Sequence, residues 1–143
     1  MAPARMNDAE WRQFLLSEVR TAKVAVIDAS GSPHVTPVCF TLDGGDVVFI
    51  THEGRLKQRA MRRDPRIALC VDDERPPFRF VMLRGKASLD DDPASVARVT
   101  RMVCERYFEP ESVDTMTARF GRPDAFVVRL ALEQVVATRD LAG

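Results

Sequence analysis

The sequence predicts one mainly β domain, an antiparallel barrel with a few helices outside it. The length of 143 residues, spanning 1–143, suits a single domain. Six short runs rich in β-branched and aromatic residues are separated by turn residues, as in antiparallel strands. Two of these runs, 24–27 and 47–50, are apolar on both faces. A sheet with one solvated face would alternate, so these strands indicate a closed barrel covered outside by helices or a second subunit.

The first part of the chain is interpreted as a helix followed by an antiparallel meander. Residues 7–18 begin with helix-capping residues and continue with apolar residues at helical spacing. Three strands follow, with SGSP and DGG as the turn signals between them. The expected strands and turns lie, in order, at 22–28, 30–33, 34–42, 43–45 and 46–51.

The second part is expected to contain a short basic helix, two strands, two further helices and a last strand. The basic helix at 55–64 ends before Pro65, because a residue that precedes proline avoids the α conformation. Gly85 marks a bulge or bend in the second strand, and Pro93 opens the next helix. The remaining ranges are 66–72 and 78–89 for strands, 93–107 and about 112–120 for helices, and 125–138 for the last strand.

The charge balance and the hydropathy of the chain exclude several classes of function. Basic and acidic residues are equal in number, 21 of each, whereas nucleic-acid-binding domains are usually basic overall. No apolar run approaches the roughly 20 residues that span a bilayer. The first residues lack the apolar segment of a signal peptide. We therefore expect a cytoplasmic protein that binds neither nucleic acid nor membrane.

The cysteines and histidines do not form a metal-binding pattern. Cys39, Cys70 and Cys104 are odd in number and show no CxxC spacing, so buried, reduced thiols are expected. His34 and His52 are the only histidines, and neither has a carboxylate or cysteine at metal-ligand spacing. The sequence predicts no metal site.

The stretch THEGRLKQRAMRRDPR at 51–66 concentrates positive charge in a chain of zero net charge. It holds six basic residues directly after an expected strand. At about 100° per residue, Arg55, Arg59 and Arg62 fall on one stripe of the helix. Charged stripes of this kind are usually solvated. Lys57 lies across the helix from this stripe.

Lys57 is the residue that indicates a binding site. It is expected on the inward side of the helix, beside Leu56, Ala60 and Met61. A lysine in that position is costly unless it meets an anion, and the free N–H groups of the first helical turn favour one as well. Thr51 adds a hydroxyl at the end of the preceding strand. From the residues alone, a phosphate site and a solvated helix both remain open.

Two motifs resemble those of a known superfamily. They are G-x-P-H-x-x-P-V at 31–38 and K-x-x-x-M-R-R-D-P-R at 57–66. They are similar to motifs of the split β-barrel flavin and deazaflavin oxidoreductases, which include pyridoxamine 5′-phosphate oxidase. The likeness is greatest to the branch that uses coenzyme F420, and it covers about residues 10–138. It implies an FMN-binding-like split antiparallel β-barrel and a homodimer with two cofactor sites at the subunit interface.

The resemblance also implies where the cofactor binds. Thr51, Arg55 and Lys57 would hold its phosphate. Pro37 and Val38 would present backbone groups to the edge of the tricyclic ring. Pro37 suits a place where strand pairing loosens to admit a ligand, because proline lacks a ladder donor.

Three further residues are weaker candidates for cofactor binding under the same resemblance. Gln58 would meet the ribityl chain. Arg62 would meet an anionic tail, which is polyglutamate in F420. Arg79 would reach the site from the partner subunit. No catalytic side chain is assigned, since in hydride transfer the cofactor carries the reactivity.

The function implied is hydride transfer between F420 and a small unsaturated organic molecule. The alternative within the fold is an FMN-binding oxidase or flavin reductase. A third interpretation is a non-catalytic protein that binds a flavin or a tetrapyrrole. The basic stripe favours F420, because FMN ends at its phosphate.

Overall fold

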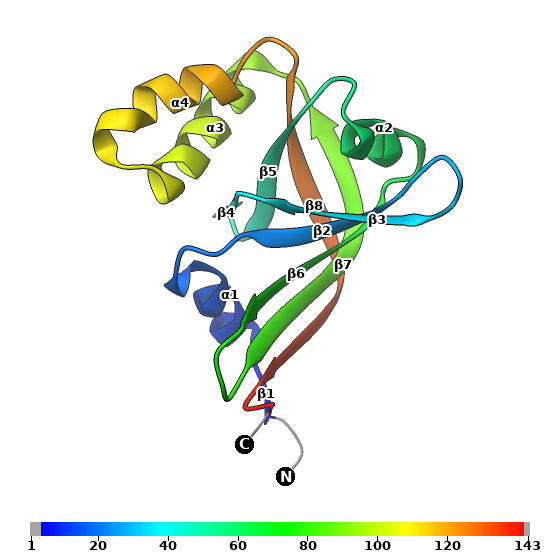
Figure 1. Ribbon diagram of the computed structural model, residues 1–143, viewed down its shortest axis with the longest axis vertical. Helices are drawn as coiled ribbons and strands as arrows, with labels where there is room; N and C mark the ends of the chain where they lie inside the picture. The colour runs from blue at the N-terminus through cyan, green and yellow to red at the C-terminus, as the bar shows by residue number, and fades with distance from the viewer. Residues whose placement is uncertain (1–3, 142–143) are drawn as a thin grey trace.

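The computed structural model describes residues 4–141, which form an antiparallel sheet and four α-helices. The strands are β1 (Ala4–Arg5), β2 (Ala22–Ile27), β3 (Pro33–Val38), β4 (Phe40–Asp43), β5 (Asp46–His52), β6 (Arg66–Asp73), β7 (Arg79–Asp90) and β8 (Ala125–Arg139). The helices are α1 (Asp8–Ser17), α2 (Leu56–Arg63), α3 (Pro93–Tyr107) and α4 (Val113–Phe120), with a short 3₁₀ turn, η1 (Pro110–Ser112), before α4. Figure 1 shows α3 and α4 side by side at one end of the sheet, with α2 across from them.

The sheet is a half-barrel, as the prediction of a split antiparallel barrel requires. Its strand order is β3-β2-β6-β7-β8-β5-β4, and β1 pairs with β8. Within the described residues β3 and β4, the two ends of this path, do not pair with each other. The expectation of a fully closed barrel is therefore wrong, and the opening lies between these two strands.

The expected strand 34–42 is in fact two strands, and this correction explains the opening. β3 pairs with β2, whereas β4 pairs with β5 on the opposite edge of the sheet. Only Cys39 separates β3 from β4, so the chain crosses from one edge to the other at this residue. Pro37 lies in an edge strand, where the missing N–H of proline is tolerated.

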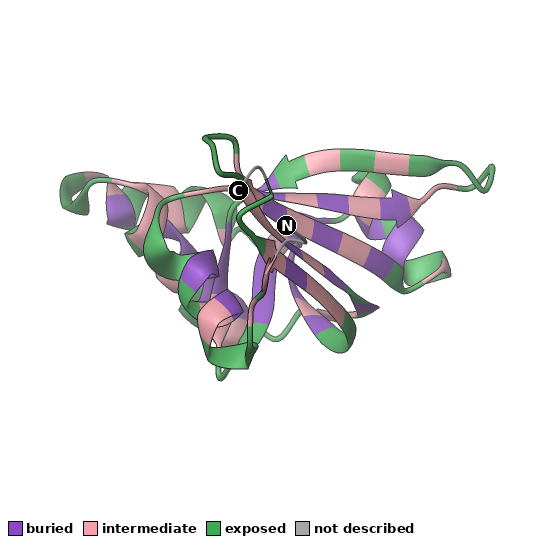
Figure 2. Cartoon of the chain, turned by 90° about the horizontal axis from the view of Figure 1, so that it is seen from below, coloured by how far each residue is buried: buried purple, intermediate pink, exposed green. Residues whose placement is uncertain are grey.

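Two hydrophobic clusters explain why some strands are apolar on both faces. The larger cluster fills the inside of the half-barrel and includes Phe49 and Leu83. The smaller cluster lies on the outer face of β5 and β8, where Val48 packs against Val99 of α3. Figure 2 shows buried and less buried residues alternating along several strands. The second apolar face of β5 is thus covered by a helix.

The local signals for element boundaries mostly hold. Asn7 caps α1 through a capping box in which its side chain accepts from the Glu10 N–H and Glu10 bonds back to the Asn7 N–H. Gly85 marks a bulge, as predicted, since the register of β7 on β8 shifts between Arg84 and Gly85. A side chain at Gly85 would overlap the backbone oxygen of Ala131. Among residues 4–141, no helix is both long and apolar enough for a membrane span.

Candidate functional site

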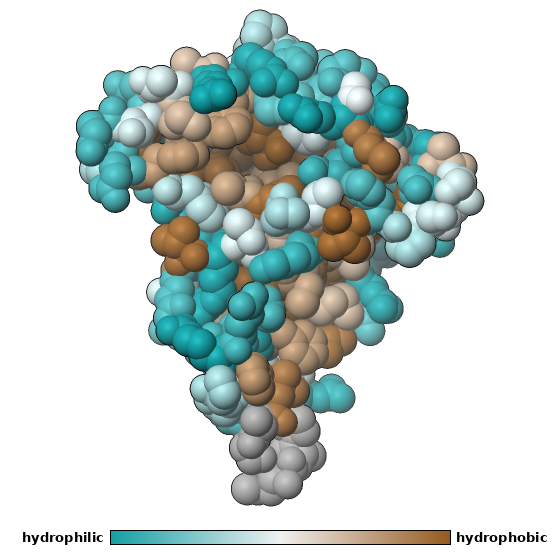
Figure 3. All heavy atoms as spheres, in the orientation of Figure 1, coloured by the Kyte–Doolittle hydropathy of each residue, from teal (hydrophilic) through white to brown (hydrophobic). Residues whose placement is uncertain are grey.

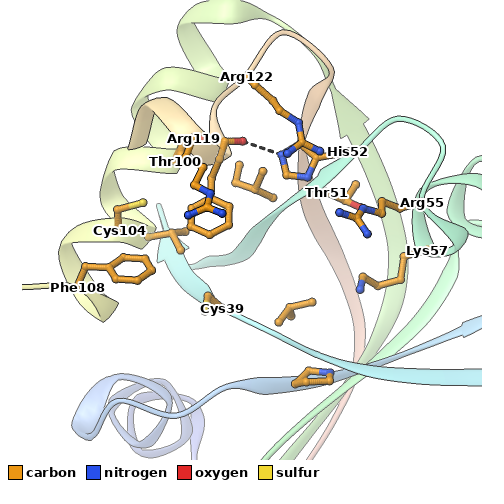
Figure 4. A pocket seen from close by; sticks show the side chains of 15 residues that line it. Cys39, Thr51, His52, Arg55, Lys57, Thr100, Cys104, Phe108, Arg119 and Arg122 are labelled. Atoms are coloured by element: carbon orange, nitrogen blue, oxygen red, sulfur yellow. Dashed lines mark hydrogen bonds between the residues drawn. The ribbon is translucent and has the colours of Figure 1, made fainter. Parts of the chain in front are cut away.

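A pocket of about 430 Å³ lies at the opening of the half-barrel. Its walls come from the β3–β4 crossing, the end of β5, the start of α2, and the α3–α4 pair (Figure 4). In Figure 3 apolar residues form the floor of a hollow between α2 and the α3–α4 pair, inside a mostly hydrophilic rim. The lining residues are Pro37, Val38, Cys39, Ile50, Thr51, His52, Arg55, Lys57, Thr100, Val103, Cys104, Phe108, Arg119, Phe120 and Arg122.

The wall on the α2 side carries hydrogen-bond donors. Thr51 is buried at the end of β5, and a turn at Gly54, whose φ is +82°, redirects the chain into α2. Arg55 is the N-cap of α2, and its side chain makes no capping hydrogen bond. Lys57 is half-buried, and its Nζ donates to Oγ1 of Thr36 at 2.7 Å. Figure 4 shows Arg55 and Lys57 on this side of the pocket.

The position of Lys57 makes its positive charge costly. Burial, and to a smaller extent the nearby Arg55, lowers the pKa of Lys57 below its usual value of 10.5. Both causes penalise the charged form. A bound anion would act in the opposite direction, because an opposite charge at short range favours the ammonium form.

The pocket as a whole is cationic. Four of its lining residues are Lys or Arg, and none is Asp or Glu. Arg122 pairs with Asp124 at 2.7 Å. The other three cations, Arg55, Lys57 and Arg119, have no carboxylate oxygen within 4.0 Å in the part of the chain that the structure describes. Unpaired cations around an apolar floor are suited to a ligand that has an apolar part and carries negative charge.

The opposite wall comes from α3 and α4 and was not foreseen from the sequence. The rings of Phe108 and Phe120 stack with centroids 6.1 Å apart and planes at 22°. The Nε2 atom of His52 and the Phe120 carbonyl oxygen are hydrogen-bonded at 2.8 Å, which ties the end of α4 to β5. The only signal in the sequence was a pair of arginines, Arg119 and Arg122, on either side of the glycine that ends α4.

The three cysteines differ in exposure. Cys104 is buried and Cys70 is half-buried, while Cys39 is exposed at the β3–β4 crossing. The expectation of buried thiols is wrong for Cys39, because the chain leaves the sheet at this residue. Burial is the main reason that the pKa of Cys104 is raised, so this thiol stays neutral near pH 7. No group of three or more His, Cys, Asp or Glu residues that could hold a metal occurs in residues 4–141.

Five of the eight residues proposed from the sequence meet at this pocket. They come from three separate elements, namely β3, β5 and the start of α2. The five are Pro37, Val38, Thr51, Arg55 and Lys57. Their contact with a cofactor stays a prediction, but the fold brings them together.

The other three proposed residues do not line this pocket. Gln58 is buried, and its Oε1 accepts from the Gly54 N–H at 3.1 Å, so it holds the turn before α2. Arg62 lies over the ring of Phe126, 5.3 Å from its centroid. Arg79 pairs with Asp73 at 2.9 Å. Their roles in cofactor binding remain predictions.

The helical phasing of α2 also needs one correction. Ala60 and Met61 are buried, as expected for the inward side. Leu56 was expected beside them but is 37% exposed. It is the first residue of α2, which begins at the rim of the pocket.

Comparison with known protein families finds a family profile that matches most of the chain. The profile of the pyridoxamine 5′-phosphate oxidase family matches residues 8–139. The chain belongs to this family. Its fold is the FMN-binding split barrel, a mainly antiparallel half-barrel with four helices. A search of curated proteins found no match.

Solved structures that resemble this chain share its fold, but their names indicate different functions. Conserved hypothetical protein Rv2991 from Mycobacterium tuberculosis is 27% identical, with a TM-score of 0.86 over 100% of this chain and 92% of that one. An F420 reductase is 22% identical, with a TM-score of 0.67 over 86% of this chain and 94% of that one. The heme storage protein HutZ from Vibrio cholerae is 18% identical, with a TM-score of 0.73 over 93% and 96%. Of these structures with the same fold, one is thus named as a reductase and another as a heme storage protein.

Proposed function

We propose that this protein is an F420-dependent oxidoreductase that transfers a hydride between F420 and a small unsaturated organic molecule. The observation that carries the proposal is the pocket itself. It has an apolar floor and, among residues 4–141, three cations without a carboxylate partner and no acidic lining residue. F420 combines a flat ring system with a phosphate and an anionic tail. The resemblance of the sequence motifs to the F420-using branch adds support.

The donor set on the α2 side fits a phosphate. Thr51 offers a hydroxyl, and Arg55 and Lys57 offer two cations on one wall of the pocket. Lys57 already bears the cost of partial burial, since its pKa is lowered. A phosphate in contact with these groups would relieve that cost through charge-assisted hydrogen bonds. These three side chains would therefore hold the phosphate.

The β3–β4 crossing fits the ring of the cofactor. Pro37 and Val38 end an edge strand, and both line the pocket. Backbone groups on a free strand edge are open to a ligand, because they have no second strand to pair with. Ile50 also lines the pocket and would supply apolar surface to the ring. These residues would orient the ring and exclude water from one side of it.

The outer face of α2 favours F420 over FMN. Arg59 is exposed and follows Arg55 by one helical turn, so positive charge continues from the pocket along the helix. The polyglutamate tail of F420 could meet this charge, whereas FMN ends at its phosphate. Arg62 contacts Phe126 and lies 3.9 Å from Glu53, so it would have to leave both residues to contact the anionic tail.

The chemistry of the reaction belongs to the cofactor, which when reduced and bound supplies a hydride for an electron-poor carbon while a proton from solvent completes the reduction. The chain binds and orients the reactants and keeps water out. The α3–α4 wall closes the pocket on the side away from α2. We assign no side chain as proton donor.

Two other functions of the same fold would use the same pocket. FMN would also place a phosphate against Thr51, Arg55 and Lys57. A tetrapyrrole storage protein would use the cations for acidic side groups. His52 is the only histidine in the lining, and its Nε2 is already bonded to the Phe120 carbonyl oxygen. This bond disfavours His52 as an iron ligand.

We also propose that the protein is a homodimer. Several large apolar side chains are exposed, and a partner surface would cover them. The most exposed of them are Val19, Val35 and Leu16, at 65%, 59% and 47%. In such a C2 dimer, the family resemblance implies that Arg79 would meet the pocket of the other subunit.

The test of the proposed function is turnover. Purified protein would be mixed with reduced F420 and a set of activated alkenes and enones, and the return of oxidised F420 would be followed optically. We expect protein-dependent oxidation with at least one acceptor and none without protein. Tight F420 binding with no turnover across the set would favour a storage role. Turnover with reduced FMN alone would favour the flavin alternative.

A further inference from the structure

We propose that the α3–α4 wall of the pocket binds the carboxylate of the substrate, and that the substrate is a flat unsaturated or aromatic acid. This inference rests on the proposed function and names the substrate class of the same site. It starts from Arg119, the last but one residue of α4. Arg119 lines the pocket and has no carboxylate oxygen within 4.0 Å among residues 4–141.

Arg119 is placed apart from the cations that would hold the cofactor phosphate. Figure 4 shows its side chain on the α3–α4 side, while Arg55 and Lys57 lie on the α2 side. One anion bound near Lys57 would therefore leave Arg119 free for a second anion.

The other arginine on this wall is already paired. Nε of Arg122 lies 2.7 Å from Oδ1 of Asp124. Asp124 thus compensates the charge of Arg122. Arg119 is the cation on this side that lacks such a partner, so it is the residue we assign to the substrate.

The surface beside Arg119 fits a planar apolar group. The stacked rings of Phe108 and Phe120, with Val103 of α3, line the same side of the pocket. A planar ligand gains from contact with such rings, and its carboxylate would accept hydrogen bonds from the guanidinium. A neutral ligand that covers Arg119 would instead leave a desolvated charge without a partner. The wall therefore selects acids over their neutral analogues.

The experiment compares trans-cinnamate with cinnamamide, which has the same planar body without the charge. Both are titrated by calorimetry into protein saturated with oxidised F420. The wild type should bind cinnamate roughly two- to fivefold more tightly, because Arg119 is exposed and contacts between exposed charges are weak. Arg119→Gln should lose most of this preference and keep its affinity for cinnamamide. The control Arg84→Gln, an exposed residue of β7, should behave as the wild type.

The outcomes separate the two proposals. Equal binding of the two probes by the wild type, no binding of cinnamate, or an unchanged preference in Arg119→Gln would overturn the assignment of Arg119. A loss of F420 affinity in Arg119→Gln, in place of a loss of cinnamate affinity, would assign the residue to the cofactor and would also overturn it. If the wild type binds no F420, the proposed function fails, and the same pair of probes titrated into the cofactor-free protein still decides the role of Arg119.

Discussion

Replacing Lys57 by methionine should weaken cofactor binding without harming the fold. Lys57 is half-buried and donates a hydrogen bond of 2.7 Å to Thr36. It has no carboxylate oxygen within 4.0 Å among the described residues. Methionine keeps a long unbranched side chain and removes only the charge and the donor. The change therefore isolates the electrostatic contribution of this residue.

The expected magnitude follows from these contacts. A hydrogen bond to a charged group contributes about 1.5–3 kcal/mol, so F420 affinity should fall roughly ten- to 150-fold. The unfolding free energy of the cofactor-free protein should stay within about 0.5 kcal/mol of the wild type or rise, because removing a partly buried charge offsets the lost hydrogen bond to Thr36. Weaker binding with equal or greater stability is characteristic of a binding residue.

The assay is a fluorescence titration with F420 together with urea unfolding of the cofactor-free protein. Arg59→Met is the control, since Arg59 lies on the exposed face of α2. This replacement should reduce the free energy of F420 binding by less than about 1 kcal/mol. Equal losses in the two variants would refute the inward position of Lys57. Full affinity in Lys57→Met would refute its contact with the phosphate.

The pH dependence of binding offers a second check on Lys57. Its charged form binds an anion, and its pKa lies below 10.5 mainly because of burial. Wild-type affinity should therefore fall as the pH rises through that lowered pKa, at a lower pH than an ordinary lysine would give. In Lys57→Arg this fall should be absent, because arginine stays charged. A profile that is the same for both proteins would exclude Lys57 as its cause.

Three further predictions concern the fold and assembly. Gly85→Ala should destabilise the protein by about 2–3 kcal/mol in urea unfolding, because its Cβ would overlap the Ala131 backbone oxygen, and a neutral effect would contradict the bulge geometry. Asp43 pairs with Arg98 and Arg129, which lower the pKa of its carboxyl from 3.8 to about 2. The ionised Asp43 should thus add about 2 kcal/mol to the free energy of unfolding above pH 4, and this contribution should be lost as the pH falls towards 2. The Asp43→Asn variant should therefore unfold at a lower urea concentration than the wild type at pH 7, but at a similar concentration at pH 2. Light scattering should report a dimer, and a monomer at micromolar concentration would contradict this prediction. A crystal structure of the dimer should show an interface above roughly 2,000 Å².

Local signals in the sequence were strong enough to predict most elements. Pro93 at the first turn and periodic apolar residues gave α3 its full range, 93–107. The isolated Gly85 within a strand predicts a bulge or bend, and the register shift at this residue confirms it. Pro65 correctly ended the basic helix, which stops at Arg63. These signals act within a few residues of one another and so can be identified in the sequence.

The parts that the sequence missed depend on contacts between distant elements. The apolar pattern of 34–42 continues across Cys39 and so predicts one strand, whereas the pairing of β3 with β2 and of β4 with β5 divides it into two. The pocket wall that holds Arg119 and Phe120 is formed where α4 packs on α3, and no pattern in either helix indicates that they face Lys57. The candidate residues of β3 and α2 could be predicted because they lie in or beside the two motifs at 31–38 and 57–66.

Titrating cofactor-free protein with F420 and FMN in parallel, at low and at physiological salt, tests the central claim most directly. We predict tighter binding of F420 at low salt, and a narrower difference at higher ionic strength, because exposed contacts between Arg59 and the anionic tail are screened over about 8–10 Å. FMN that co-purifies at full occupancy, with no measurable F420 binding, would contradict the account.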